Sequence, residues 1–221
     1  MLKTLVAGLA LASSWTWIIG MYLPRIMMER HGWAGFLAFA VPNVIGCTAF
    51  GFVLRKRGAA TALRTQIEGE AKWFSSATIA FHVLFAVFLV KSLLGEDGLS
   101  VPQSEAPVAA GAFLGAAFLL SLLPKSVFPW LGALVWVGSI TLFGLKADTP
   151  ITSAAPCDLN ALWSLPLFTA GLLICPYLDL TFHEVRRSAH HAAFGIFGMA
   201  FALMLLLTVV IWMGDGPRPV S

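Results

Sequence analysis

Long apolar stretches alternate with short polar connections along most of the chain. A helix that crosses a bilayer needs about 20 apolar residues. Helices are the expected form of these stretches, because a helix satisfies its own backbone N–H and C=O groups inside hydrocarbon. The seven expected spans are Leu5–Leu23, Trp33–Leu54, Trp73–Leu94, Pro107–Leu123, Phe128–Leu145, Leu162–Leu180 and Ala192–Met213. The pattern predicts an all-α integral membrane protein with one transmembrane domain over residues 1–221.

The composition supports this class. Apolar residues make up 58% of the chain and charged residues 11%, with a mean hydropathy of +0.84. A soluble domain carries about 25% charged residues, and this chain has too few to cover a surface that faces water. A soluble enzyme, a disordered chain and a nucleic-acid binder are thereby excluded. We expect the lipid bilayer as the surrounding medium, in the cytoplasmic (inner) membrane of a bacterium.

Basic residues in the connections predict the orientation. Cytoplasmic loops are enriched in Lys and Arg. With the N-terminus inside, nine basic residues fall inside and five outside. The inner ones are Lys3, Arg55, Lys56, Arg57, Arg64, Lys72, Lys125, Arg186 and Arg187, and the outer ones are Arg25, Arg30, Lys91, Lys146 and Arg218. We therefore expect the N-terminus inside and the C-terminus outside.

Proline interrupts two of the expected spans next to polar side chains. The first contains Gly20-Met21-Tyr22-Leu23-Pro24, and the sixth contains Cys175-Pro176-Tyr177-Leu178-Asp179. Proline removes a backbone donor and clashes with the preceding turn, so both helices are expected to kink or unwind. Carboxylates inside membranes usually mark ion or substrate paths. The alternatives are a kinked outer end for the first helix and a solvated interfacial position for Asp179.

Three other features have two interpretations each. Asn43 follows Pro42 at the centre of the second span, where it either packs against another helix or faces a polar cavity. His82 is central in the third span and is a proton-relay candidate or a hydrogen-bonded packing residue. The inner connection 55–72 contains either a short helix on the membrane surface or a solvated helical loop. We expect no metal ligand set and no cofactor, and the three cysteines are expected to be free thiols.

The interrupted helices carry a resemblance to a known family. With Phe39-Ala40-Val41-Pro42-Asn43 in the second span, they resemble the leucine-transporter-type fold of the amino-acid–polyamine–organocation superfamily, which includes sodium–solute symporters. The resemblance implies a five-helix repeat over residues 1–147, two further helices over 160–214, and a site near the midplane between helices one and six. The candidate substrate-binding residues are Trp17, Gly20, Tyr22, Pro24, Asn43, Pro176, Tyr177, Asp179 and Thr181.

Three functions are compatible with these observations. The first is a transporter-like protein that binds a small polar solute or ion, as a homo-oligomer because half of the family's scaffold is missing. The second is a non-catalytic membrane subunit or sensor, which docks a partner membrane subunit through small-residue faces. These faces contain Gly111, Gly115, Ala116, Gly132, Gly138, Gly195 and Gly198. The third is a haem-binding protein or other membrane enzyme, although we identify no catalytic residues.

Overall fold

Every regular element in the described part of the chain is a helix. The computed structural model describes residues 1–16, 20–56, 58–93, 106–145 and 156–213. The elements are α1 (Leu2–Trp15), α2 (Met21–Val53), α3 (Ala59–Gln66), α4 (Glu68–Leu93), α5 (Ala106–Ser121), α6 (Phe128–Leu145), the short 3-10 helix η3 (Leu159–Ser164), α7 (Leu165–Leu178), α8 (Leu180–Ser188) and α9 (Ala192–Met213). The predicted all-α class is confirmed for these residues.

Three described helical segments are long and apolar enough to cross a membrane. They are Tyr22–Val53, Leu159–Leu178 and Ala192–Val210. Shorter apolar helices cover Leu2–Trp15, Pro107–Ser121 and Phe128–Leu142. Large apolar side chains also lie exposed along α4, α5 and α6, including Trp73, Phe118 and Trp130. These features agree with a membrane protein, whereas the seven crossings and their orientation stay predictions.

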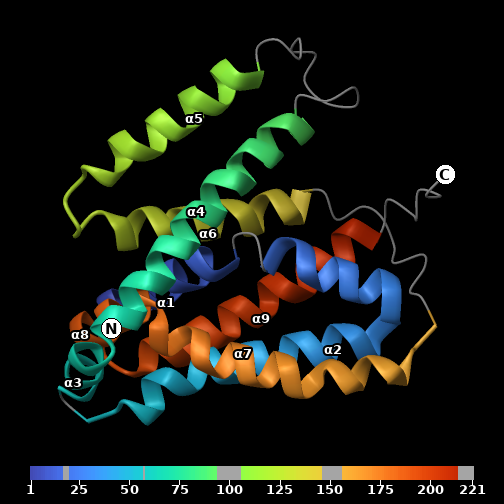
Figure 1. Ribbon diagram of the computed structural model, residues 1–221, viewed down its shortest axis with the longest axis horizontal. Coiled ribbons are helices and arrows are strands. Elements are labelled where there is room, and N and C mark those ends of the chain that lie inside the picture. Colours follow the sequence, from blue (N-terminus) through green and yellow to red (C-terminus); the bar gives the residue numbers. More distant parts are fainter. Residues whose placement is uncertain (17–19, 57, 94–105, 146–155, 214–221) are drawn as a thin grey trace.

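The core forms where α1, α2, α7 and α9 pack together, with α6 lying against α1 (Figure 1). Its largest fully buried side chains are aromatic: Phe39, Phe50, Phe182, Phe194, Phe197 and Phe201. The Phe50 and Phe182 rings meet edge to face with centroids 5.6 Å apart. Such a geometry favours aromatic pairs beyond the area that they bury. Close aromatic packing therefore fixes how these helices cross.

Glycine permits the closest approach between α2 and α7. A Cβ atom at Gly46 would lie 2.9 Å from the carbonyl oxygen of Leu172. Pro176 lies four residues after Leu172 and has no N–H, so this carbonyl lacks its helical donor. The sequence thus places a side-chain-free position on α2 opposite a free carbonyl on α7.

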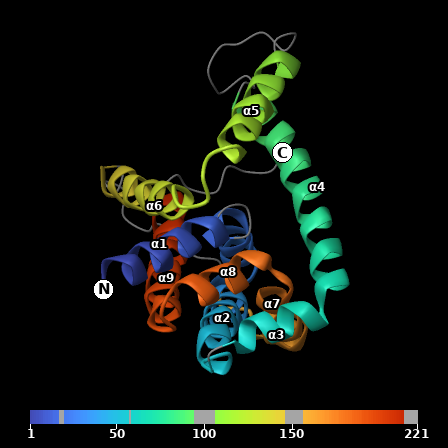
Figure 2. The same ribbon diagram turned by 90° about the vertical axis from the view of Figure 1, so that its left-hand side faces the viewer.

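A hairpin of α4 and α5 stands apart from the bundle. Figure 2 shows both helices extending away from the packed helices. α4 packs on α5 and, at its beginning, on α3 and α7. The side chains of Ile79, Phe113 and Leu119 are exposed on this hairpin. The hairpin is consequently joined to the core over only a small part of its length.

The structure shows where the helices that contain the prolines begin and end. α1 ends at Trp15 and α2 begins at Met21, so Pro24 is the fourth residue of α2 and leaves the carbonyl of Gly20 without its helical donor. Within α2 the non-helical residue is Gly32, with φ 60° and ψ −153°, whereas Pro42 stays inside the helix. α7 ends at Leu178, and Asp179 is extended with φ −81° and ψ 113°. The depth of these helix ends in a bilayer stays a prediction.

Candidate functional site

A cavity of about 830 Å³ lies between α1, α4, α5 and the junction of α7 with α8. Most of its wall is apolar, formed by residues such as Phe74, Phe81 and Phe113. Its polar lining residues are Ser14, Ser75, Thr78, His82, Cys175, Asp179 and Thr181. Cavities of this kind, apolar with a few polar groups, are typical of small-molecule sites.

Asp179 is the carboxylate in this cavity. It is the extended residue between α7 and α8, and its Oδ1 accepts a hydrogen bond from the Thr181 backbone N–H at 2.7 Å. This contact caps the start of α8. Within the described residues no Lys or Arg pairs with Asp179, and its hydrogen bonds come from the backbone and side chain of Thr181. The half-buried carboxylate can thus accept a further donor from a ligand.

The two histidines nearest to Asp179 each direct a ring nitrogen at a backbone carbonyl oxygen. His183 is buried, and its Nδ1 and Nε2 lie 3.0 Å and 2.7 Å from the carbonyl oxygens of Ala60 and Tyr177. Both ring nitrogens thus face backbone carbonyls and not Asp179. His82 Nδ1 lies 2.6 Å from the Thr78 carbonyl oxygen. His183 therefore ties α3 to the end of α7 and has no N–H left for Asp179.

Asn43 lies directly behind the cavity wall. Trp15, which lines the cavity, donates its indole N–H to Asn43 Oδ1 at 3.0 Å. The Cys47 thiol donates to the same oxygen at 3.5 Å. Asn43 is fully buried, and its Nδ2 has no hydrogen-bond partner among the described residues. Most buried polar groups are paired, so this amide is a donor that a buried water molecule would satisfy.

The structure brings together part of the predicted site. Asp179, Thr181 and the proton-relay candidate His82 line one cavity. Asn43 does not line it but accepts a hydrogen bond from Trp15, which does. Pro176 is buried at the end of α7, and the Tyr177 ring packs against Phe50 with centroids 5.2 Å apart. These two shape the helix end that carries Asp179. As binding residues, all of them stay predictions.

The other predicted site residues lie elsewhere. Gly20 packs against α9, where a Cβ atom would lie 3.2 Å from the Phe201 ring. The Tyr22 ring contacts Phe85 of α4, with centroids 5.4 Å apart. Pro24 is buried near the start of α2, and Trp17 is outside the described residues. Gly20, Tyr22 and Pro24 are therefore not among the residues that line the cavity.

Several lining residues have no distinctive sequence signal. Ser14 and Ser75 each stand beside a second serine in an apolar stretch, and Thr78 follows Ser75 by about one helical turn. Only the packing of α4 against α7 makes Ser75 and Thr78 neighbours of Asp179. Among the described residues, no group of His, Cys, Asp or Glu could hold a metal ion. No protein-family model, curated protein or solved structure matches the chain.

Proposed function

We propose that this chain is a transporter-like membrane protein that binds a small solute in the Asp179 cavity. The solute has an apolar body and a cationic or hydrogen-bond-donating end. The observation that carries the proposal is the carboxylate of Asp179, which lies in a largely apolar cavity and has no Lys or Arg partner among the described residues. Burying an unpaired carboxylate is costly, and a bound donor would offset that cost.

The arrangement of the helices supports transport as well as binding. The cavity lies where the α4–α5 hairpin joins the bundle, so a movement of the hairpin changes access to Asp179 and leaves the aromatic core intact. Parts with few buried contacts open at low free-energy cost. In this proposal the chain crosses the membrane seven times, with its N-terminus inside and helix ends near the midplane at residues 16–20 and at Asp179. A second copy completes the wall, as the missing half of the leucine-transporter-type scaffold implies.

A thiol-protection experiment tests the binding site. Cys175 lines the cavity, Cys47 is fully buried and Cys157 is exposed, so Cys157→Ser leaves Cys175 as the thiol open to monobromobimane. We expect benzylamine to slow the labelling and benzyl alcohol to protect less. Asp179→Asn removes a charge-assisted hydrogen bond and is expected to weaken the protection by benzylamine about tenfold.

Asp158→Asn is the matched control, because Asp158 is a carboxylate that does not line the cavity. It should leave protection by benzylamine unchanged. Uptake of radiolabelled benzylamine into proteoliposomes then separates transport from binding. Equal protection in the Asp179→Asn variant and the parent would show that Asp179 does not anchor the solute.

Open small-residue positions favour a second candidate function, the docking of a partner membrane subunit. A Cβ atom at Gly111, Gly115 or Gly138 would meet nothing within 4 Å. In contrast, the space beside Gly132 is occupied by Ala10 and the space beside Gly198 by Thr48 of this chain. Gly111 and Gly115 are four residues apart on α5, a spacing that lets another helix approach closely.

Bulky substitutions on α5 distinguish this second function from solute binding. We expect Gly111→Leu with Gly115→Leu to abolish co-purification of a partner subunit if α5 is the docking face, because leucine blocks close helix approach. Protection of Cys175 by benzylamine should be unaffected. Gly138→Leu on α6 is the control, because that glycine is equally open but belongs to another helix. Unchanged co-purification in the double variant would contradict docking through α5.

A further inference from the structure

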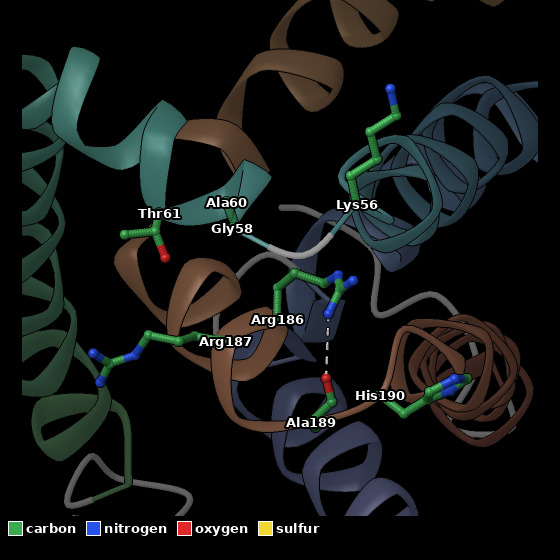
Figure 3. Close-up of a pocket in the computed structure, with 8 residues that line it drawn as sticks. All are labelled: Lys56, Gly58, Ala60, Thr61, Arg186, Arg187, Ala189 and His190. Carbon is green, nitrogen blue, oxygen red and sulfur yellow. Dashed lines mark hydrogen bonds between the residues drawn. The ribbon is translucent and has the colours of Figure 1, made fainter.

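A second cavity, of about 400 Å³, lies between the start of α3 and the end of α8. Its lining is rich in cationic side chains. The residues are Lys56, Gly58, Ala60, Thr61, Arg186, Arg187, Ala189 and His190 (Figure 3). It shares no lining residue with the Asp179 cavity.

Arg186 occupies the centre of this second cavity's wall. Its guanidinium donates to the carbonyl oxygens of Leu54 at 2.9 Å, Arg55 at 2.6 Å and Ala189 at 3.4 Å. Figure 3 shows the side chain aimed at Ala189. No carboxylate among the described residues pairs with it. A guanidinium has five N–H groups, so two remain for a ligand, and its charge is not neutralised by a side chain.

The surrounding charges are positive. The one carboxylate described nearby, Glu184, is engaged by Arg187 through both of its oxygens at 2.9 Å. In Figure 3 the Arg187 guanidinium points away from Arg186. The pKa of His191 lies below its ordinary value, first because of desolvation and then because of the positive charges of His190, Arg55 and Arg186. Lys56 and Arg186 therefore give this cavity a net positive field, and His190 lines the same cavity.

The first turn of α3 adds to this field. Gly58 precedes α3 in the left-handed conformation, with φ 83°, and no side chain caps the helix. Gly58, Ala60 and Thr61 all line the cavity. The positive end of a helix dipole favours an anion, and here it supplements the side-chain charges of Lys56 and Arg186.

We propose that this cavity binds a phosphate-bearing anion through Lys56, Arg186 and His190. Guanidinium and ammonium groups are the preferred partners of phosphate oxygens. The anion is either the headgroup of an acidic phospholipid, at the interface that the basic connections predict to be cytoplasmic, or free phosphate. This binding does not depend on the proposed function of the Asp179 cavity.

The test compares the loss of a lysine charge inside the cavity with the loss of a lysine charge at an exposed position outside it. Arg186 caps the end of α2, so it is left intact, and Lys56→Gln with His190→Gln changes two exposed side chains. The control is Lys125→Gln, an exposed lysine outside the cavity. Thermal unfolding in neutral detergent is measured against sodium phosphate, with sodium chloride at matched ionic strength. We expect phosphate to raise the unfolding temperature, with an affinity about tenfold weaker in the double variant and unchanged in the control.

A lipid arm distinguishes the two sources. Native mass spectrometry counts phosphatidylglycerol and phosphatidylcholine retained by each variant. Preferential retention of phosphatidylglycerol that the double variant loses identifies a lipid headgroup, and a response to inorganic phosphate without a lipid preference identifies the free anion. The single variant Lys56→Glu is measured in both the phosphate and the lipid experiments, because it changes only one exposed side chain. The proposal is overturned if neither arm shows binding, or if Lys125→Gln loses as much as the double variant.

Discussion

Trp15 and Asn43 form the contact that joins the cavity wall to the core. The Trp15 indole donates to Asn43, and its ring also meets Phe182 edge to face with centroids 5.1 Å apart. Asn43 stands out in the sequence as an amide in an apolar stretch. Its partner lies 28 residues earlier, and no periodicity within one helix indicates that pairing. The polar residue was therefore predictable, whereas the group that satisfies it was not.

Removing Asn43 should destabilise the protein. Asn43→Ala leaves the indole N–H of Trp15 without an acceptor, and such a buried donor costs about 1–3 kcal/mol. The measurement is the free energy of unfolding in mixed detergent with increasing dodecyl sulfate. Trp15→Phe and the double variant complete a mutant cycle, for which we expect a coupling of about 1 kcal/mol. Purely additive effects would show that the hydrogen bond contributes nothing.

At the scale of elements, Asp158 fixes the bend in α2 to the start of η3. Its backbone N–H donates to the His31 carbonyl at 3.2 Å, and its Oδ2 lies 3.1 Å from His31 Nδ1. His31 directly precedes Gly32, the non-helical residue of α2. A positive φ at this point requires glycine or a strained residue. The sequence predicted a boundary at Trp33, but the residue that holds the bend comes from a distant connection.

The ion pair of Asp158 makes this bend sensitive to acid. The pKa of Asp158 lies below its ordinary value, first because of the hydrogen bond with His31 and then because of the Asn160 backbone N–H. A carboxyl whose pKa is lowered by folding stabilises the protein above its unfolded-state pKa, and this stabilisation is lost as the pH falls through the folded-state value. Asp158→Asn should thus lower the unfolding temperature at pH 6, and the difference from the parent should vanish as the pH falls below about 3.8.

Glu70→Gln provides the comparison for this pH effect, because Glu70 is an exposed carboxylate that forms no ion pair with the described residues. Its unfolding temperature should follow the parent at every pH. The effect of Asp158→Asn should be small, since both partners are about one-third exposed. A difference that persists unchanged into strong acid would exclude the ion pair as its cause.

For the whole molecule, two independent features predict the arrangement of the helices in a membrane. The apolar stretches set how many helices can cross, and the basic connections set which ends face the cytoplasm. The structure adds a bundle of α1, α2, α6, α7 and α9 with an appended α4–α5 hairpin (Figure 1). The exposed apolar side chains of the hairpin are suited to contact lipid, because a bilayer solvates such surfaces as well as protein does.

Cysteine labelling checks the predicted orientation. Cys157 is exposed in a connection that we expect outside. A membrane-impermeant maleimide should label it in intact cells. In a Cys157→Ser background, Lys125→Cys lies in a connection expected inside and should react only after permeabilisation. The reverse pattern would invert the topology, and labelling of both sites in intact cells would remove α6 from the set of crossing helices.

The sequence by itself determined the helical class and indicated a membrane protein, because a chain with so few charges and such long apolar stretches has too little polar surface to cover itself in water. It also located the prolines, the buried amide of Asn43 and the carboxylate of Asp179, since each is conspicuous in an apolar context. Only the tertiary structure decided which of these residues meet. Helix packing placed His82 of α4 beside Asp179, left Gly20 and Tyr22 outside the cavity wall, and gathered Lys56, Arg186 and His190 around a second cavity. Contacts between distant helices depend on side-chain shape and crossing angle, and the local patterns that define each helix do not encode them.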